Sequence, residues 1–388
     1  MRMISRATDV ETALVALKRY PVVAILGPRQ VGKTTLARLV ARKLGVPVTL
    51  FDLERDRDLR RLDDAETALQ PLRGLVVLDE IQRRPELFPL LRVLADRRPV
   101  RTRFLILGSA SPHLLRQSSE SLAGRIRYLE LDGLGLSDVG EPRWPQLWLR
   151  GGFPLAFVAR TTSASFDWRE GLVRTYLERD IPELGLSLPA ATLRRFWTMV
   201  AHYHGQRWNS AEFARAFGLS EMTIRRYLDL LRDTFMVRAL APWAENLGKR
   251  VVKAPKVYVK DTGLLHTLLS IRAWDDLLSH PKVGASFEGF ALGEVIRRLG
   301  ADDRECHFWA TYQGAELDLL VVRGRRRLGF EFKHTAAPGV TKSMKIAADD
   351  LKLDRLDVVH IGKDTYPLSR GIRAVSIGRL QEDLEPLS

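Results

Sequence analysis

Short apolar runs alternate with amphipathic segments over the first part of the chain. Pro21–Leu26 is apolar almost throughout and predicts a buried strand, and Thr34–Leu44 has the pattern of a helix. Further strands are expected at Val48–Asp52, Leu75–Leu78 and Arg103–Leu107. Strands that alternate with helices favour an α/β fold with a parallel sheet covered on both faces.

Two changes of pattern divide the rest of the chain. The turn cluster Gly151-Gly152-Phe153-Pro154 marks the first, and helical patterns then dominate from Asp167 to Arg232. The second change follows Pro281, after which a predicted helix is followed mostly by predicted strands. A chain of 388 residues is also too long for a single compact core. We therefore expect three domains, over residues 1–150, 151–280 and 281–388.

Most of the later predicted elements are strands. The apolar stripe of Ser286–Leu299 indicates a helix, and a basic turn, Arg323–Arg327, separates two of the strands that follow. The strands are expected at Phe235–Leu240, Lys256–Lys260, Glu316–Val322, Leu328–Phe332 and Asp357–Ile361.

The chain is strongly basic, with a formal net charge of +14. Such a charge biases the surface toward polyanions, so nucleic acid is the first candidate partner and an anionic membrane surface the second. A general preference for arginine would explain the same charge without any such partner. This alternative stays open at the level of composition.

Cysteine content and apolar patterning indicate in which cellular compartment the protein is expected. The single cysteine, Cys306, excludes an intramolecular disulfide and a cysteine-based zinc site. The segment Met1–Val10 has no apolar core of a signal peptide, and no apolar run approaches the length of a membrane span. We expect a cytoplasmic protein that does not enter a membrane.

A phosphate-binding loop stands between the first predicted strand and helix. The segment with the Walker A spacing is Gly27-Pro28-Arg29-Gln30-Val31-Gly32-Lys33-Thr34, followed by Thr35. Its glycines let backbone N–H groups turn toward phosphate oxygens, and the helix N-terminus adds its dipole. Lys33 is expected on the β- and γ-phosphates and Thr34 on Mg²⁺. The motif and its flanks predict an ATP site.

The run Leu75–Leu78 ends in the carboxylate pair Asp79 and Glu80. This pair belongs at the carboxyl ends of the strands, where the phosphate-binding loop also lies. Asp79 would hold the Mg²⁺ of ATP through water, and Glu80 is placed to orient or deprotonate the attacking water. Paired with the Walker A segment, these residues predict hydrolysis of ATP.

Two further residues are candidates at this site. Ser109 follows the predicted strand Arg103–Leu107 and could sense the γ-phosphate or orient the water, although a strand-end turn would explain it as well. Arg125 could act as an arginine finger toward a neighbouring subunit. A surface charge is the alternative for Arg125 in a chain so rich in arginine.

The middle segment has the pattern of a helix-turn-helix. Ser210 could cap a helix over Ala211–Phe217, and Ser220 a second helix over Glu221–Arg232. Three residues near the start of the second helix would meet a DNA groove: Thr223, Arg225 and Arg226. The two strands that follow would form a wing, whose basic residues Lys249, Arg250, Lys253 and Lys256 would contact phosphates. A helical lid used only for packing or partner docking is the alternative.

Carboxylates and a lysine recur on the C-terminal strands. Residues two apart share a face of a strand, so Glu331 and Lys333 point the same way. A hairpin that brought Asp318 beside them would create a site for Mg²⁺ or Mn²⁺, to which Glu288 could add a further ligand. Alternatively, the charged residues Glu331 and Lys333 would belong to a half-exposed edge strand without a metal site.

Three segments together resemble a known family. They are Gly-Pro-Arg-Gln-Val-Gly-Lys-Thr-Thr-Leu at 27–36, Leu-Asp-Glu-Ile-Gln at 78–82, and Lys-Ala-Pro-Lys-Val-Tyr-Val-Lys-Asp-Thr-Gly-Leu at 253–264. With Ser121–Arg125 and Gly151–Pro154, they are similar to prokaryotic AAA-family ATPases that carry a C-terminal domain of unknown function, number 4143.

The resemblance carries specific structural expectations. It implies an AAA-type ATPase core, a winged-helix region and a C-terminal α/β fold similar to restriction endonucleases and other PD-(D/E)XK nucleases. Asp318, Glu331 and Lys333 match the nuclease motif, with Glu288 as a helical contributor. Leu317 stands where that motif usually has proline.

The resulting hypothesis is a DNA-binding ATPase that remodels or translocates DNA. Two alternatives remain, an ATP-dependent metal nuclease and an ATP-switched regulator that acts by binding protein or DNA. Because AAA proteins often form rings, a homo-oligomer is a further possibility.

Overall fold

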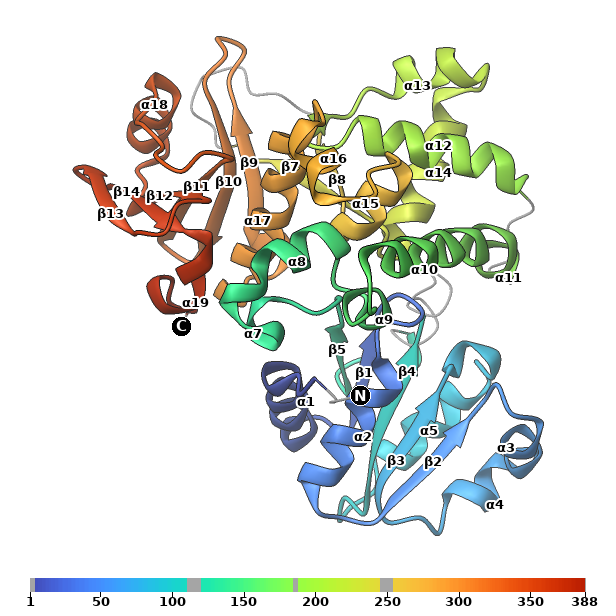
Figure 1. The fold of residues 1–388 in the computed structure, drawn as a ribbon. Helices are drawn as coiled ribbons and strands as arrows, with labels where there is room; N and C mark the ends of the chain where they lie inside the picture. The colour runs from blue at the N-terminus through green and yellow to red at the C-terminus, as the bar shows by residue number, and fades with distance from the viewer. Residues whose placement is uncertain (1–3, 110–119, 184–187, 245–253, 388) are drawn as a thin grey trace. The chain divides into compact units, whose positions relative to one another are not determined.

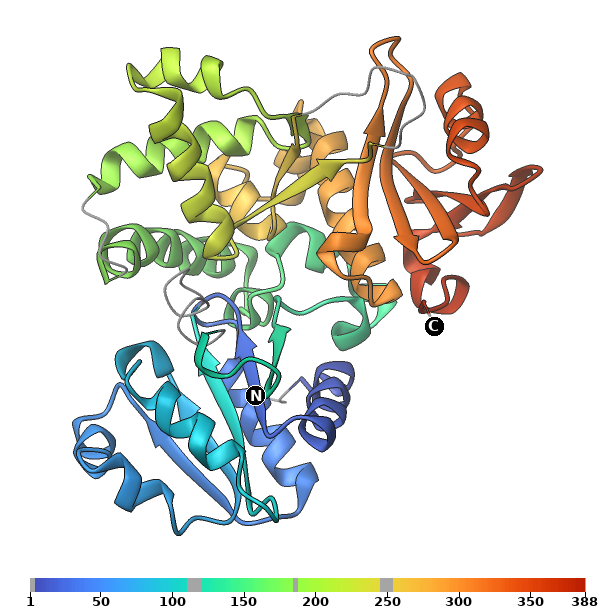
Figure 2. The same cartoon turned by 180° about the vertical axis from the view of Figure 1, so that it is seen from behind.

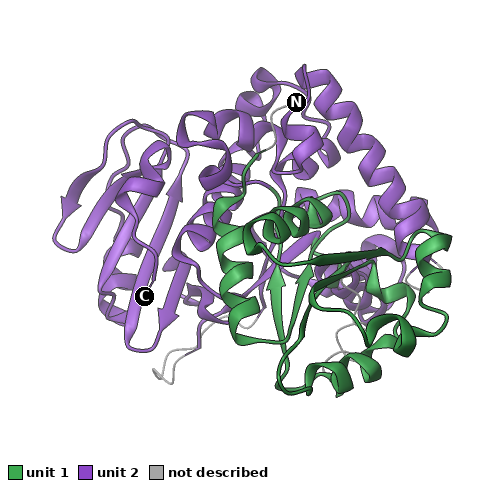
Figure 3. Cartoon of the chain, turned by 90° about the horizontal axis from the view of Figure 1, so that it is seen from below, with its two compact units in different colours: residues 1–133, 233–235 green, residues 134–232, 236–388 purple. Residues whose placement is uncertain are grey.

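The computed structural model describes residues 4–109, 120–183, 188–244 and 254–387 (Figures 1 and 2). The chain divides into two compact units (Figure 3). Unit 1 consists of Met1–Gly133 with Asp233–Phe235, and unit 2 of Leu134–Arg232 with Met236–Ser388. The division after Gly133 thus precedes the Gly151 turn, and unit 2 contains most of the middle segment together with the C-terminal one.

Unit 1 contains a parallel sheet with the order β2-β3-β4-β1-β5. The strands are β1 (Val22–Leu26), β2 (Val48–Asp52), β3 (Gly74–Asp79), β4 (Thr102–Gly108) and β5 (Ile126–Glu130). Four of them confirm the strands expected from the apolar runs. The edge strand β5 was not predicted, because its residues Ile-Arg-Tyr-Leu-Glu remain partly or fully exposed and do not form an apolar run.

Helices cover both faces of this sheet. The helices of unit 1 are α1 (Ala7–Arg19), α2 (Lys33–Leu44), α3 (Asp56–Arg61), α4 (Ala65–Leu69) and α5 (Leu87–Ala95), with a 3₁₀ turn η1 (Ile81–Arg83). One face packs side chains such as Val76, Phe104 and Ile106 against Phe88 and Leu91 of α5. Helix α2 contacts β3 and β4 and confirms the predicted helix after the loop.

Unit 2 begins with a helical region (Figure 1). Its helices before the C-terminal strands are α7 (Leu136–Val139), α8 (Trp144–Arg150), α9 (Pro154–Phe157), α10 (Thr162–Thr175), α11 (Ile181–Glu183), α12 (Ala190–His202), α13 (Ser210–Phe217), α14 (Glu221–Asp233), α15 (Thr262–Leu268), α16 (Trp274–Ser279) and α17 (Val283–Leu299). The side chain of Asn209 caps α13 by accepting the Glu212 N–H at 3.3 Å, so Ser210 is the first helical residue and not the predicted cap.

A mixed sheet of nine strands runs through unit 2, in the order β13-β14-β12-β11-β10-β9-β7-β8-β6. The strands are β6 (Gln206–Arg207), β7 (Val237–Pro242), β8 (Lys256–Val259), β9 (Cys306–Ala310), β10 (Glu316–Arg323), β11 (Arg326–Lys333), β12 (Arg355–His360), β13 (Tyr366–Ser369) and β14 (Ile372–Ser376). Helices α18 (Lys342–Leu351) and α19 (Leu380–Asp383) complete the unit.

The strands expected to form a wing belong to this larger sheet. β7 and β8 pair antiparallel, as a wing would, but β7 also pairs parallel with β9 through Ala241–His307 and Pro242–Phe308. The expectation of an independent wing is therefore corrected. Its short apolar strands are completed by strands from the C-terminal segment.

The core of unit 2 contains a buried polar chain around Trp148. The Trp148 indole N–H donates to Ser286 Oγ at 2.9 Å, and Ser286 lies 2.7 Å from His266 Nε2. His266 Nδ1 lies 2.9 Å from the carbonyl of Leu149. These contacts join α8, α15 and α17.

No helix in the described part of the chain is both long and apolar enough to cross a membrane.

Candidate nucleotide site and carboxylate cluster

The phosphate-binding loop connects β1 to α2 at the carboxyl edge of the parallel sheet. Gln30 and Gly32 both have positive φ, 61° and 102°. Gly27 is required for another reason, because a Cβ there would lie 2.3 Å from the carbonyl oxygen of Leu131. The glycines therefore serve two needs, one in the turn and one in close packing of the loop against the chain after β5.

Lys33 and Thr34 occupy the start of α2. The Lys33 side chain is buried, and its ammonium donates to the carbonyls of Gly27 at 3.0 Å and Pro28 at 2.8 Å. The Thr34 hydroxyl donates to Asp79 Oδ2 at 2.6 Å. The structure thus brings together the two predicted Mg²⁺ ligands. Burial raises the pKa of Asp79, and the Thr34 hydrogen bond opposes that rise.

A glutamine joins two of the predicted catalytic residues. Gln82, in the turn η1 after β3, contacts the Glu80 carboxylate through its side-chain nitrogen and donates to Ser109 Oγ at 3.0 Å. Glu80 itself has a positive φ of 57°. Sequence reasoning missed Gln82 as a site residue, although it belongs to the Leu-Asp-Glu-Ile-Gln segment.

Arg6 supports the loop from outside the motif. Its side chain is buried, and Nη2 donates to the carbonyls of Val31 at 3.2 Å and Asp132 at 2.9 Å. Arg6 therefore ties the phosphate-binding loop to the segment after β5. No motif marks this residue, which stands just before α1.

Arg125 lies at the other end of the sheet. It directly precedes β5, whose Ile126 pairs with Val22 at the start of β1, while the phosphate-binding loop follows the end of β1. Its guanidinium binds both carboxylate oxygens of Asp96, at 2.6 and 2.8 Å. The structure thus gives Arg125 an intramolecular partner away from the loop, and its role as an arginine finger stays a prediction.

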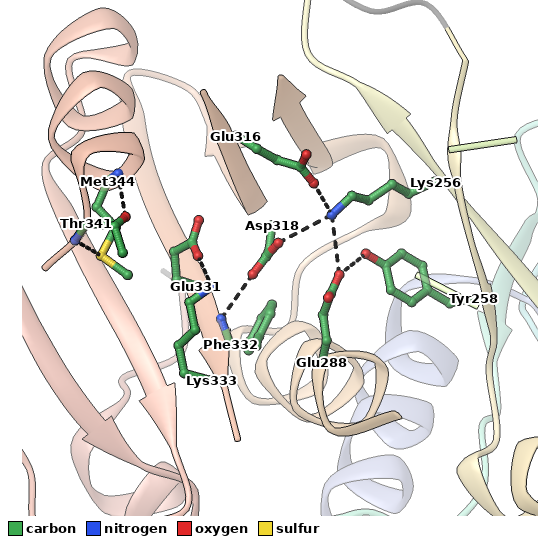
Figure 4. Close-up of polar contacts among 10 residues, drawn as sticks. All are labelled: Lys256, Tyr258, Glu288, Glu316, Asp318, Glu331, Phe332, Lys333, Thr341 and Met344. Carbon is green, nitrogen blue, oxygen red and sulfur yellow. Dashed lines mark hydrogen bonds and ion pairs between the residues drawn. The ribbon is translucent and has the colours of Figure 1, made fainter. Parts of the chain in front are cut away.

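In unit 2, the β10–β11 hairpin gathers the predicted carboxylates. Lys333 Nζ lies 2.8 Å from Glu331 Oε2, as expected for residues on one face of β11. The backbone N–H of Phe332 donates to Asp318 Oδ2 at 3.2 Å. Glu288 enters from α17 and accepts a hydrogen bond from the Tyr258 hydroxyl at 2.6 Å (Figure 4). We call Glu288, Glu316, Asp318 and Glu331 the carboxylate cluster.

Lys256 lies inside this cluster and not on a basic surface loop. Its ammonium lies 3.3 Å from Asp318 Oδ1 and 3.4 Å from Glu288 Oε1, and it contacts Glu316 (Figure 4). The side chain is only 5% exposed. The prediction that Lys256 contacts DNA phosphates is therefore wrong, because the first residue of β8 points into the protein. Lys249, Arg250 and Lys253 lie outside the described residues.

Burial and mutual repulsion change the acidity of the cluster. Burial and the nearby Asp318 raise the pKa of Glu288 to about 7 and that of Glu331 to about 8. The neighbouring carboxylates raise the pKa of Lys256 against the opposing effect of burial. Among the described residues, no group of three or more His, Cys, Asp or Glu side chains has the arrangement of a metal site. The expected metal at Asp318, Glu331 and Glu288 thus gains no support.

The helix-turn-helix residues lie on α14 as expected. Ser220 accepts the Thr223 backbone N–H at 3.1 Å and so caps the helix. Arg225 and Arg226 are exposed, and Arg225 lies 3.5 Å from Glu221. Thr223 is half-buried, and its hydroxyl lies 2.9 Å from that of Ser220. Of the three residues, the two arginines therefore offer charge to a partner.

Comparison with protein families divides the chain into three successive matches. Residues 19–139 match an AAA domain, residues 141–275 a domain of unknown function (DUF8612), and residues 283–380 a domain of unknown function (DUF4143). The AAA match contains the phosphate-binding loop, Asp79 and Ser109. The chain therefore has a P-loop AAA-type ATPase fold.

Two mycobacterial proteins are similar over most of the chain. The uncharacterized proteins Rv2008c of Mycobacterium tuberculosis and Mb2031c of Mycobacterium bovis are each 50% identical over 363 residues, which cover 93% of this chain and 81% of theirs. The chain belongs to their family. This chain itself combines an AAA domain with two domains of unknown function.

A solved structure supports the fold. The Walker-type ATPase PABY2304 of Pyrococcus abyssi superimposes with a TM-score of 0.50 at 16% identity, over 69% of this chain and 96% of that one. At that identity the similarity concerns the fold. It agrees with a parallel sheet that carries the phosphate-binding loop at its carboxyl edge.

Proposed function

We propose that the chain hydrolyses ATP at the phosphate-binding loop of unit 1. The observation that carries this proposal is the contact of Thr34 with Asp79 beside the Glu80-Gln82-Ser109 chain, all at the carboxyl edge of one sheet. Lys33 supplies a positive charge for the phosphates of ATP. These groups come from three separate segments: the start of α2, the end of β3 with the turn η1, and the end of β4. The fold brings all three together at the carboxyl edge of the sheet.

The oxygen atoms of Thr34 and Asp79 fit Mg²⁺, which prefers hard oxygen ligands. They would hold the ion that accompanies ATP, and its chemistry there is to neutralise phosphate charge. Glu80 accepts the proton of the attacking water, while Gln82 fixes the orientation of the Glu80 carboxylate. Ser109 completes the chain through its hydrogen bond with Gln82.

Steady-state ATP hydrolysis and nucleotide binding by the full chain test this proposal. Lys33→Ala should weaken ATP binding, whereas Glu80→Gln should keep binding and lower kcat by roughly 100-fold or more. Glu86→Gln, at an exposed carboxylate that pairs with Arg84, is the matched control and should retain activity. Hydrolysis by Glu80→Gln at the wild-type rate would contradict the role of Glu80.

We further propose that the protein uses ATP hydrolysis to act on DNA, with α14 as a contact element. The exposed Arg225 and Arg226 at the start of a capped second helix support this proposal, as does the net charge of +14. Affinity for duplex DNA, measured against salt concentration, tests it. Arg225→Gln with Arg226→Gln should weaken binding and flatten the salt dependence.

The exposed pair Arg174 and Arg179 on the helical segment after Thr161 provides the matched control. Both arginines form ion pairs with glutamates on the same helix, as Arg225 does. Their substitution by glutamine removes the same charge and should leave DNA affinity higher than the α14 double variant. Equal affinity and salt dependence in wild type and the α14 variant would mean that α14 does not contact DNA. No salt-dependent DNA binding by wild type would favour an ATP-switched regulator that binds protein.

A further inference from the structure

The carboxylate cluster contains a cation that belongs to the chain itself. An ammonium group has three N–H donors, and that of Lys256 meets three carboxylates, from Glu288 on α17 and from Glu316 and Asp318 on β10 (Figure 4). Each of these carboxylates was a potential oxygen ligand for a metal ion. Their common partner is instead a buried lysine from β8.

We propose that Lys256 takes the place of a divalent metal ion in this cluster and keeps Mg²⁺ and Mn²⁺ out of it. Mg²⁺ requires oxygen ligands at about 2.0–2.1 Å in nearly octahedral geometry. An ammonium among the same carboxylates occupies their oxygens and repels a second cation at short range. The carboxylates therefore stabilise a lysine where a nuclease of this residue pattern would hold a metal-activated water.

Backbone pairing and ion pairs together explain why the Lys256 ammonium stays in place. Within the sheet, Lys256 pairs with Arg207 of β6 on one side and Leu240 of β7 on the other. This pairing fixes the backbone of Lys256 but not its side chain, whose ordering costs a further amount of about 2 kcal/mol that the three ion pairs must offset. Withdrawal of the ammonium would leave buried carboxylates without their common partner, which is costly.

The same ion pairs join β8 to the C-terminal strands. Sheet pairing between the two segments runs through β7 and β9, at Ala241–His307 and Pro242–Phe308. Lys256 adds a side-chain connection from β8 to β10 and α17. The lysine thus replaces the metal both as a counter-ion and as the group that gathers the carboxylates.

A pocket of about 580 Å³ borders the cluster at Lys256 and Glu316, with Arg207 and Trp208 also in its walls. The Glu316 side chain is 37% exposed, whereas that of Asp318 is only 11% exposed. Shortening Lys256 would therefore connect the inner carboxylates with an open pocket. This arrangement makes the proposal testable, because an ion from solution would gain a path to them.

The test measures Mn²⁺ bound to the full chain without nucleotide, by electron paramagnetic resonance. Wild type and Asp318→Asn should bind equal amounts, since no ion depends on Asp318. Lys256→Ala should bind one additional Mn²⁺ per chain, and the double variant with Asp318→Asn should lose it. The phosphate-binding loop is the same in all four proteins, so its metal binding cancels.

Lys333→Ala is the matched control, because it removes a second lysine ammonium beside the cluster, one that pairs with Glu331. It should gain no Mn²⁺ while Lys256 remains. An Asp318-dependent ion in wild type, an equal gain in Lys333→Ala, or no gain in a folded Lys256→Ala would overturn the proposal. If Lys256→Ala does not fold, the comparison of wild type with Asp318→Asn decides alone.

Discussion

Gln82 Nε2 donates a hydrogen bond to Ser109 Oγ at 3.0 Å and at the same time contacts the Glu80 carboxylate. The amide thus joins the end of β3 to the end of β4. These two strands are neighbours in the sheet, so the contact is short although the residues are 27 positions apart. The Gln82 amide is therefore a common partner of the Glu80 carboxylate and the Ser109 hydroxyl.

The first prediction concerns this contact. Gln82→Ala should lower kcat for ATP hydrolysis by about 10-fold or more and leave nucleotide affinity near the wild-type value, because the amide contacts Glu80 and Ser109 and its proposed role is to orient Glu80 for attack by water. Steady-state kinetics with parallel measurement of ATP binding would check it. Gln70→Ala, at an exposed glutamine after α4, serves as the control. Equal losses in binding and turnover would indicate a folding defect.

The second prediction concerns Arg6. Arg6→Ala removes the hydrogen bonds to the carbonyls of Val31 and Asp132, so the phosphate-binding loop loses a buried support. The affinity for ATP should fall by roughly 10-fold, as expected for about 1.4 kcal/mol. Titration with a fluorescent ATP analogue would measure it. Arg19→Ala, at an exposed arginine in the last turn of α1, should bind normally.

Strands that form continuous apolar runs, such as β1 and β3, were predictable from sequence, whereas the edge strand β5 was not. β1 is a continuous run of apolar residues because helices cover both faces of its sheet. β5 lies at the edge of that sheet and mixes arginine and glutamate with apolar residues, so no run marks it. In the C-terminal hairpin, the shared face of Glu331 and Lys333 was predictable because residues two apart point to the same side of a strand.

Residues that act by tertiary contact left no local pattern. The motif identified Lys33 and Thr34 at once, but Gln82 became a candidate only when β3 and β4 lay side by side. Gln82 was missed as a site residue, whereas Lys256 was assigned a DNA contact that its buried position contradicts. A strand was predicted from Lys256 onward, but the neighbouring basic residues suggested an exposed side chain. The side chain instead points inward, toward carboxylates up to 62 positions away.

The third prediction concerns two segments that mark the family. Asp261 accepts the backbone N–H groups of Gly152 at 2.7 Å and Leu264 at 2.8 Å, and so joins the Gly151-Gly152 turn to α15. Asp261→Ala leaves both buried donors unpaired and should lower the free energy of unfolding by about 2–4 kcal/mol. Urea denaturation would measure it. Asp275→Ala, at an exposed residue of α16, should change stability by less than about 0.5 kcal/mol.

The last prediction concerns pH and His266. Burial lowers the pKa of His266 to about 3, while the hydrogen bond to the Leu149 carbonyl opposes that change. The two contacts of the ring fix the neutral form that carries its proton on Nδ1. Nδ1–H donates to Leu149, so Nε2 must accept the Ser286 hydroxyl, which in turn accepts the Trp148 indole N–H. Protonation of Nε2 would break this chain.

The sign of the pH effect follows from that lowered pKa. Below the ordinary value of about 6.5 an unfolded His266 binds a proton that the folded protein refuses until about pH 3, so stability falls as pH decreases through that window. Between pH 7 and pH 5.5 the loss amounts to about 1.2 kcal/mol. The raised pKa values of Glu288 and Glu331 act in the opposite direction, since a protonated folded carboxyl favours the folded state at lower pH.

Comparison of wild type with His266→Gln separates the pH effect of His266 from that of Glu288 and Glu331. Wild type and the variant both retain the carboxylate cluster, and glutamine does not titrate. The stability advantage of wild type over this variant should shrink by about 1.2 kcal/mol between pH 7 and pH 5.5, in urea unfolding followed by tryptophan fluorescence. His202→Gln, at an exposed histidine, is the control and should keep a nearly constant difference. A wild-type advantage over His266→Gln that stays constant with pH would mean that the folded protein accepts the proton on His266, contrary to the hydrogen-bond chain through Ser286.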